Sequence, residues 1–120
     1  MTAGKRILFV DDEQVLATLG RDLLEDFGHQ VICAFNGEQA LECFRQHGPF
    51  DLVVTDESMP GMSGIELAQE IYRLAPAVPV VLCSGHMLSM HEEGMETTNI
   101  NHVLSKTEVC SKLPELIQQL

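Results

Sequence analysis

Carboxylate side chains follow two separate apolar runs of the sequence. Asp11 and Asp12 come directly after residues 7–10, and Asp56 comes directly after residues 52–55. Carboxylates that meet at the ends of two buried strands repel one another unless positive charge lies among them. The pattern therefore predicts a site for a divalent metal ion and an anion.

Two more polar residues end apolar runs, Ser84 after residues 80–83 and Lys106 after residues 103–105. Hard oxygen ligands with several retained waters are typical of Mg²⁺, often with a phosphate completing the shell. One carboxylate could then act as a nucleophile and form an acyl phosphate. Lys106 would stabilise the phosphoryl oxygens during in-line transfer, and Ser84 could donate a hydrogen bond to one of them.

The apolar pattern alternates between strand-like runs and helical periodicity. Strands are predicted at residues 5–10, 30–35, 51–55, 80–83 and 100–104. The first predicted helix spans residues 14–27, with an inward stripe of Leu16, Leu19, Leu23 and Phe27. Further helices are predicted after the N-cap Asn36, from the capping box that starts at Ser63, over residues 86–99, and over residues 112–120. Ser111 is the expected N-cap of the last helix, because Pro114 is tolerated only in a first turn.

Strands that alternate with helix-length connections predict an α/β fold with a parallel sheet covered on both faces. We expect a doubly wound, five-stranded sheet of flavodoxin-like order 2-1-3-4-5 with five helices, in a single domain over residues 5–120. Ligands of such folds bind at the carboxyl ends of the strands. The polar residues identified above all lie at those ends.

The composition excludes several classes of function. The 120 residues carry a formal net charge of −11, which disfavours binding to nucleic acid or to anionic lipid. Apolar runs are too short to span a membrane, and residues 1–6 lack the apolar core of a signal peptide, so a cytoplasmic location is expected. The four cysteines form no CxxC pair and predict no zinc site.

In order and in position, these motifs closely resemble the receiver domain of two-component response regulators. The matching residues are Asp11-Asp12, Asp56 with Met59-Pro60 and Gly64, Ser84-Gly85, and Lys106. The resemblance implies that Asp56 accepts a phosphoryl group from a sensor histidine kinase or a histidine phosphotransfer protein. It also implies that Asp12, Asp56 and the backbone carbonyl of Ser58 bind Mg²⁺ directly, and that Asp11 acts largely through water. Switching would act on a downstream output domain or protein.

Three residues depart from the pattern of the family. Val103 stands where an aromatic switch residue is usual, so the usual aromatic readout is expected to be absent or replaced. Thr107 follows Lys106 where proline is usual, and a cis bond before a non-proline residue costs about 2.5–4 kcal/mol, so the bond is either trans or strained. Glu57 follows the phosphoacceptor, where its charge is expected to add repulsion and to sharpen the dependence on metal.

Two other functions remain open on the sequence. The chain could be a receiver fold that docks partners without phosphorylation, which Val103 and Thr107 favour modestly. It could also be a small Mg²⁺-dependent phosphohydrolase, but no second Asp follows Asp56 as a general acid. We therefore expect no enzyme activity beyond its own phosphorylation and dephosphorylation. The receiver could be stand-alone or a piece of a hybrid histidine kinase.

Overall fold

Residues 4–85 and 97–119 are described by a computed structural model of the chain. These residues form nine elements that alternate as the periodicity predicted, up to the fourth strand. The strands are β1 (Arg6–Val10), β2 (Gln30–Ala34), β3 (Leu52–Asp56), β4 (Val80–Ser84) and β5 (Ile100–Ser105). The helices are α1 (Gln14–Asp26), α2 (Gly37–His47), α3 (Gly64–Leu74) and α4 (Val109–Gln118).

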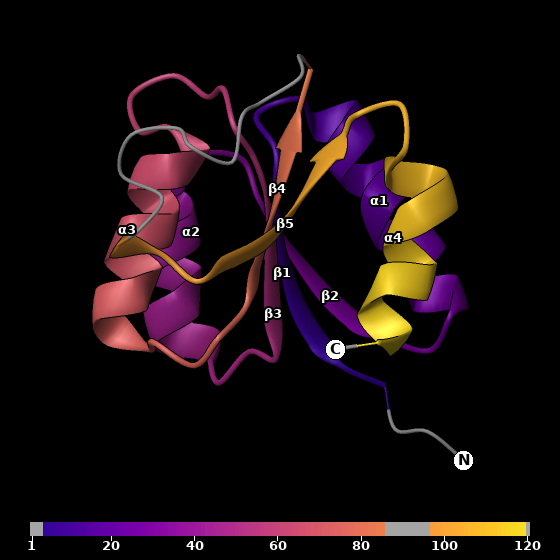
Figure 1. The fold of residues 1–120 in the computed structure, drawn as a ribbon, viewed down its shortest axis with the longest axis horizontal. Helices are drawn as coiled ribbons and strands as arrows, with labels where there is room; N and C mark the ends of the chain where they lie inside the picture. The colour runs from indigo at the N-terminus through magenta and orange to yellow at the C-terminus, as the bar shows by residue number, and fades with distance from the viewer. Residues whose placement is uncertain (1–3, 86–96, 120) are drawn as a thin grey trace.

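The strands form one parallel sheet in the order β2-β1-β3-β4-β5, which confirms the predicted topology. Helices α2 and α3 cover one face of this sheet, and α1 and α4 cover the other (Figure 1). The described part of the chain therefore contains four helices where five were expected. The fifth predicted helix, over residues 86–99, falls largely on residues 86–96, which lie outside the described residues.

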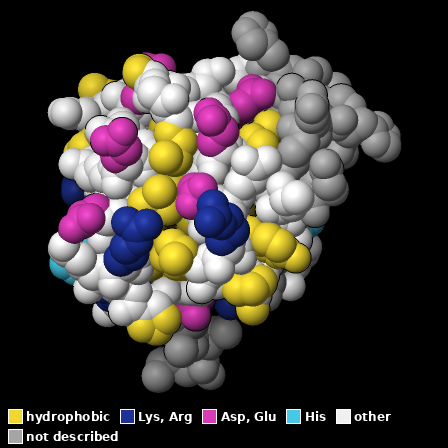
Figure 2. Space-filling model, turned by 90° about the vertical axis from the view of Figure 1, so that its left-hand side faces the viewer, with side chains coloured by type: hydrophobic (Ala, Val, Ile, Leu, Met, Phe, Trp, Pro, Cys, Tyr) yellow, Lys and Arg dark blue, Asp and Glu magenta, His cyan; other side chains and the backbone are white. Residues whose placement is uncertain are grey.

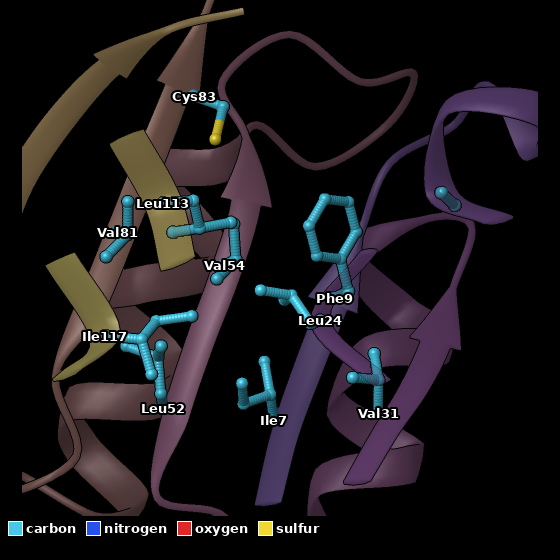
Figure 3. Packing of buried hydrophobic residues seen from close by; sticks show 11 residues of the cluster. Ile7, Phe9, Leu24, Val31, Leu52, Val54, Val81, Cys83, Leu113 and Ile117 are labelled. Atoms are coloured by element: carbon cyan, nitrogen blue, oxygen red, sulfur yellow. The ribbon is translucent and has the colours of Figure 1, made fainter. Parts of the chain in front are cut away.

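The core consists of two apolar layers, one on each face of the sheet. Successive side chains of a strand point to opposite faces, so Ile7 and Phe9 enter one layer while Leu8 and Val10 enter the other. Figure 3 shows the layer between the sheet and helices α1 and α4. Because both faces are covered, the central strands β1, β3 and β4 are buried and apolar along most of their length. These strands support the carboxyl edge of the sheet.

Helix α1 packs on the sheet through small residues rather than through its largest apolar ones. Ala17, Gly20 and Leu24 are buried, whereas the predicted stripe is wrong because Leu19 and Phe27 are more than half exposed. A Cβ atom added to Gly20 would lie 2.5 Å from the ring of Phe9. Close approach of helix and sheet thus selects the face with small residues, which a pattern based on large apolar side chains does not detect.

Helix α4 begins at Val109, so the predicted start at residue 112 with Ser111 as N-cap is wrong. The amide of Lys112 donates to the carbonyl of Glu108 at 2.8 Å, and the Ser111 hydroxyl donates to the same carbonyl at 3.2 Å. Pro114 consequently lies in the second turn, where its ring removes one helical hydrogen bond. Burial of Leu113 and Ile117, both fully enclosed in the core, offsets that loss.

The predicted caps of α2 and α3 are confirmed. The Asn36 side chain accepts a hydrogen bond from the amide of Gln39, at 2.7 Å. Ser63 and Glu66 form the reciprocal capping box at the start of α3. These caps fix where α2 and α3 begin, beside the carboxyl edge of the sheet.

Gly64 lies where α3 comes closest to the end of β3. A Cβ atom at this position would lie 2.2 Å from the carbonyl oxygen of Asp56 and 2.9 Å from Leu82. We expect Gly64→Ala to lower the free energy of unfolding by about 2–3 kcal/mol, because backbone must shift to relieve the overlap. Urea unfolding followed by circular dichroism measures this loss. Gly85→Ala is the matched control, since a Cβ there meets no atom of residues 4–85 or 97–119 within 4 Å; an equal loss in both variants would contradict the packing argument.

The surface over α2 and α3 mixes acidic, basic and apolar side chains (Figure 2). One ion pair on α3 joins Arg73 to Glu70 at 3.2 Å. No helix in the ranges 4–85 and 97–119 combines the length and apolar character needed to cross a bilayer.

Candidate functional site at the carboxyl edge of the sheet

The polar residues singled out in the sequence meet at one edge of the sheet. Asp11 and Asp12 follow β1, Asp56 is the last residue of β3, Ser84 is the last residue of β4, and Lys106 follows β5. Because all strands are parallel, these positions lie at the same edge. The expectation that Lys106 lies beside the carboxylates is confirmed.

Asp11, Asp12 and Asp56 form a compact acidic group. Each offers a carboxylate oxygen, and the three oxygens lie within 4.8 Å of one another. Asp11 and Asp56 are buried, at 6% and 3% exposure, while Asp12 is exposed. Hard oxygen donors on one open side suit a cation such as Mg²⁺ or Ca²⁺, which retains water on its exposed positions. The residues present thus fit a divalent metal ion.

Lys106 supplies the positive charge of this edge. Its ammonium nitrogen lies 2.9 Å from Asp56 Oδ2, 3.8 Å from Asp11 Oδ2 and 3.9 Å from Glu13 Oε1. The bond to Asp56 is a direct, charge-assisted hydrogen bond, whereas the other two contacts are longer ion pairs. The lysine is thereby aimed at the carboxylate that the resemblance implies is the phosphoacceptor.

Burial dominates the electrostatics of the two enclosed carboxylates. Loss of hydration raises the pKa of Asp56 above its ordinary value, although the hydrogen bond from Lys106 acts in the opposite direction. Burial likewise raises the pKa of Asp11, against the hydrogen bond from the Glu13 amide. Burial disfavours the Lys106 ammonium, but the hydrogen bond to Asp56 and the nearby carboxylates together outweigh it and raise the pKa of the lysine. Three carboxylates meet one ammonium group at this site, so Lys106 alone does not balance their charge.

Backbone groups orient both buried carboxylates. The Glu13 amide donates to Asp11 Oδ1 at 2.9 Å, and the Ser58 amide donates to Asp56 Oδ1 at 3.3 Å. One oxygen of each carboxylate is thus held by the loop that follows its strand, and the other oxygen faces Lys106. Ser58, predicted to contribute through its carbonyl, lies next to the acidic group and contacts it through its amide.

Ser84 has a partner that the sequence did not predict. Its hydroxyl donates to Oε1 of Glu57 at 2.8 Å. Glu57 was expected only to add repulsion, but it also accepts this hydrogen bond. The strand register could have revealed the pair. Asp56 pairs with Cys83, and the residues that follow these two are Glu57 and Ser84.

The two departures near Lys106 have definite positions. Val103 pairs with Leu82 in the β4–β5 ladder, so an aliphatic side chain occupies the position of the usual aromatic residue. Within the described ranges the cis peptide bond is Gly48–Pro49, so the bond between Lys106 and Thr107 is trans. Lys106 nevertheless reaches Asp56, since its amide is held by the Ser84 carbonyl at 2.9 Å.

A small apolar cavity of about 80 Å³ extends from this site between the sheet and helices α1 and α4. Phe9, Leu16, Leu19 and Val109 are among its lining residues, and Asp56 lies at its polar end. The sequence analysis missed this cavity, because it depends on the face that α1 presents to the sheet.

Comparison with known proteins places this geometry in a family. Residues 7–118 match the family described as response regulator receiver domain. The chain is 35% identical over 82 residues to the chemotaxis protein CheY of Thermotoga maritima, which covers 68% of each protein. It is 49% identical over 74 residues to the virulence sensor protein BvgS of Bordetella pertussis, which covers 62% of this chain but only 6% of BvgS. The structure of the response regulator TrrA of Thermotoga maritima, in complex with Mg(2+)-BeF, superposes with a TM-score of 0.86 at 31% identity, covering 96% of this chain and 97% of TrrA.

The chain therefore belongs to the response regulator receiver domain family. Its class of function is two-component signalling, in which a receiver domain takes part in a phosphorelay. The expectation drawn from the motifs at the strand ends is confirmed at this level.

Proposed function

We propose that Asp56 accepts a phosphoryl group from the phosphohistidine of a sensor histidine kinase or of a histidine phosphotransfer protein. A carboxylate oxygen of Asp56 attacks phosphorus, the bond from phosphorus to the imidazole nitrogen breaks, and the electron pair leaves with that nitrogen. The product is an acyl phosphate on this chain. The observation that carries the proposal is the 2.9 Å contact between Lys106 and the buried Asp56 carboxylate.

Each residue at the edge has a part in this transfer. Asp12, Asp56 and the Ser58 carbonyl would hold Mg²⁺, with Asp11 acting through water. Bound Mg²⁺ supplies the positive charge that lets an anionic donor approach three carboxylates. Lys106 is already beside Asp56 and can bind a phosphoryl oxygen without a large movement. Ser84 donates a hydrogen bond to another phosphoryl oxygen once transfer has occurred.

The experiment is phosphorylation of the purified chain by acetyl phosphate, with and without Mg²⁺, followed by intact mass. We expect one phosphoryl group per chain in Mg²⁺ and none after chelation, because the uncompensated carboxylates repel the donor. Absence of labelling in Mg²⁺ would remove the proposal. Continued turnover of added phosphomonoesters would instead indicate a phosphohydrolase, whereas we propose that the chain acts on no external substrate.

Mg²⁺ alone is expected to stabilise the folded chain. At free Mg²⁺ about tenfold above its Kd, binding adds about 1.4 kcal/mol, or about 5 °C in the thermal unfolding midpoint. Differential scanning calorimetry of wild type and Asp12→Asn measures the shift, which the variant should lose. Asp26→Asn, which removes an exposed carboxylate at the end of α1 far from the acidic group, should keep it. A shift of the same size in all three proteins would indicate nonspecific binding.

A second candidate is a receiver fold that binds its partner without phosphorylation. Val103 favours it, because an aliphatic side chain cannot swing a ring between buried and exposed positions. Partner affinity measured with and without Mg²⁺ and fluoroberyllate separates the two functions, since only the phosphorylation switch predicts a difference. We propose two kinds of partner, as the family implies. One is a histidine kinase, in the same chain or in another, and the other is an output domain or protein.

A further inference from the structure

We propose that Glu57 is a positioning residue that holds the Ser84 hydroxyl in the unphosphorylated chain and releases it when Asp56 carries a phosphoryl group. The inference rests on the proposed function and adds a regulatory contact to the same site. It starts from the 2.8 Å hydrogen bond between Ser84 Oγ and Glu57 Oε1. Glu57 thereby sets how readily the phosphorylated arrangement forms.

The backbone of Glu57 is fixed on both sides. Its amide donates to the carbonyl of Cys83 at 2.8 Å, and its carbonyl accepts from the amide of Gly64 at 2.8 Å. The Glu57 amide thus continues the pairing of β3 with β4 by one residue beyond Asp56 and Cys83. Glu57 consequently stands beside Ser84 whenever the sheet is folded, because the strand pairing itself brings the two residues together.

Ser84 is equally constrained. The residue is buried at 1% exposure, and its carbonyl accepts the amide of Lys106 at 2.9 Å. Its hydroxyl can therefore change partner by rotation about the Cα–Cβ bond without movement of the backbone. Such a rotation is a step between staggered conformers.

The hydroxyl carries one proton, so it cannot donate fully to Glu57 and to a phosphoryl oxygen at the same time. Hydrogen bonds to an ionised acceptor are about twice as strong as neutral ones, so the Glu57 carboxylate is a strong competitor. After phosphorylation of Asp56, the Ser84 hydroxyl must therefore leave the Glu57 carboxylate in order to donate to a phosphoryl oxygen. The charge of Glu57 also remains close to the new phosphoryl group, which favours its turning outward to solvent after release.

The test is the affinity for fluoroberyllate in saturating Mg²⁺, by fluorine NMR titration, of five proteins: wild type, Glu57→Ala, Glu57→Gln, Ser84→Ala and the double alanine variant. We expect Glu57→Ala to bind about tenfold more tightly than wild type, because the Ser84 hydroxyl no longer has to leave a carboxylate acceptor. Glu57→Gln retains an acceptor oxygen and should improve binding by less than about threefold. In the Ser84→Ala background, removal of Glu57 should change affinity by less than about twofold.

Two outcomes contradict the inference. Equal improvement by alanine and glutamine, persisting without Ser84, would show that Glu57 acts by charge repulsion alone. No improvement in Glu57→Ala would show that the hydrogen bond does not oppose the phosphorylated arrangement. If wild type bound no fluoroberyllate at all, the proposed function would fail instead.

A measurement on the unphosphorylated chain without metal tests the contact separately. Three-bond couplings of labelled serine report the Ser84 side-chain conformer. We expect one dominant conformer in wild type and in Glu57→Gln, and a different distribution of conformers in Glu57→Ala. The same conformer in all three proteins would overturn the positioning role, and Glu57→Gln keeps this comparison informative should the alanine variant fold poorly.

Discussion

Replacement of Asp56 by asparagine is expected to reduce Mg²⁺-dependent phosphorylation at least about 100-fold, to below detection. An amide oxygen is a poor nucleophile, and no other carboxylate contacts Lys106 within hydrogen-bonding distance among the described residues. Intact-mass measurement after incubation with acetyl phosphate gives the result directly. Labelling equal to that of wild type would mean that another residue is the phosphoacceptor.

The same substitution should preserve the fold. Burial raises the pKa of Asp56, so the charged form of this side chain is less favourable in the folded chain than in the unfolded chain. The side-chain amide introduced by Asp56→Asn is neutral at every pH and can still accept a hydrogen bond from Lys106. We therefore expect the thermal midpoint at neutral pH to stay equal or to rise, which separates loss of the nucleophile from loss of structure.

Replacement of Lys106 by methionine is expected to lower the free energy of unfolding at about pH 7 by about 2 kcal/mol, and to slow phosphorylation about 100-fold. The lysine is the cation nearest to Asp56 and Asp11 in the described structure, at 2.9 Å and 3.8 Å. Without it, two buried carboxylates lose their compensating charge. Lys112→Met on the exposed surface of α4 removes the same charge away from the site and is the matched control.

The stability loss of Lys106→Met should depend on pH. Asp11 and Asp56 already have raised pKa values in the folded chain, and loss of the ammonium raises them further. When the folded pKa of a carboxyl group is raised, its contribution to the free energy of unfolding falls as pH rises from the unfolded pKa, about 3.8, through the folded pKa. The difference between variant and wild type should therefore shrink as pH falls from about 7 towards 4. Urea unfolding over that range measures it, and a difference independent of pH would show that Lys106 stabilises by packing alone.

Most of the site was predictable because a parallel sheet brings the carboxyl ends of its strands to one edge. Asp11, Asp12, Asp56, Ser84 and Lys106 each follow an apolar run, and that position requires no knowledge of side-chain packing. The alternation of strands and helices predicted the parallel sheet, and the observed strand order is the flavodoxin-like order that was expected. The caps at Asn36 and Ser63 were also readable, since capping depends on residues only three apart.

Features that depend on how elements pack were not predictable in this way. The buried face of α1 is set by contact between Gly20 and Phe9, and the start of α4 by enclosure of Leu113 and Ile117 in the core. These contacts join residues from different elements. A local pattern cannot rank them against one another, because propensity is weaker than the free energy gained by burial.

By itself, the sequence determined the class of fold, the residues of the acidic edge and the family, since each of these is encoded in short runs and in their order along the chain. Only the tertiary structure decided that Lys106 contacts Asp56 directly, although the peptide bond between Lys106 and Thr107 is trans. It also decided that the Ser84 hydroxyl donates a hydrogen bond to Glu57. Hydrogen bonds between strands require a definite register and side-chain conformers that match at a scale of about 3 Å. Those are fixed by packing of the whole domain and not by any one segment.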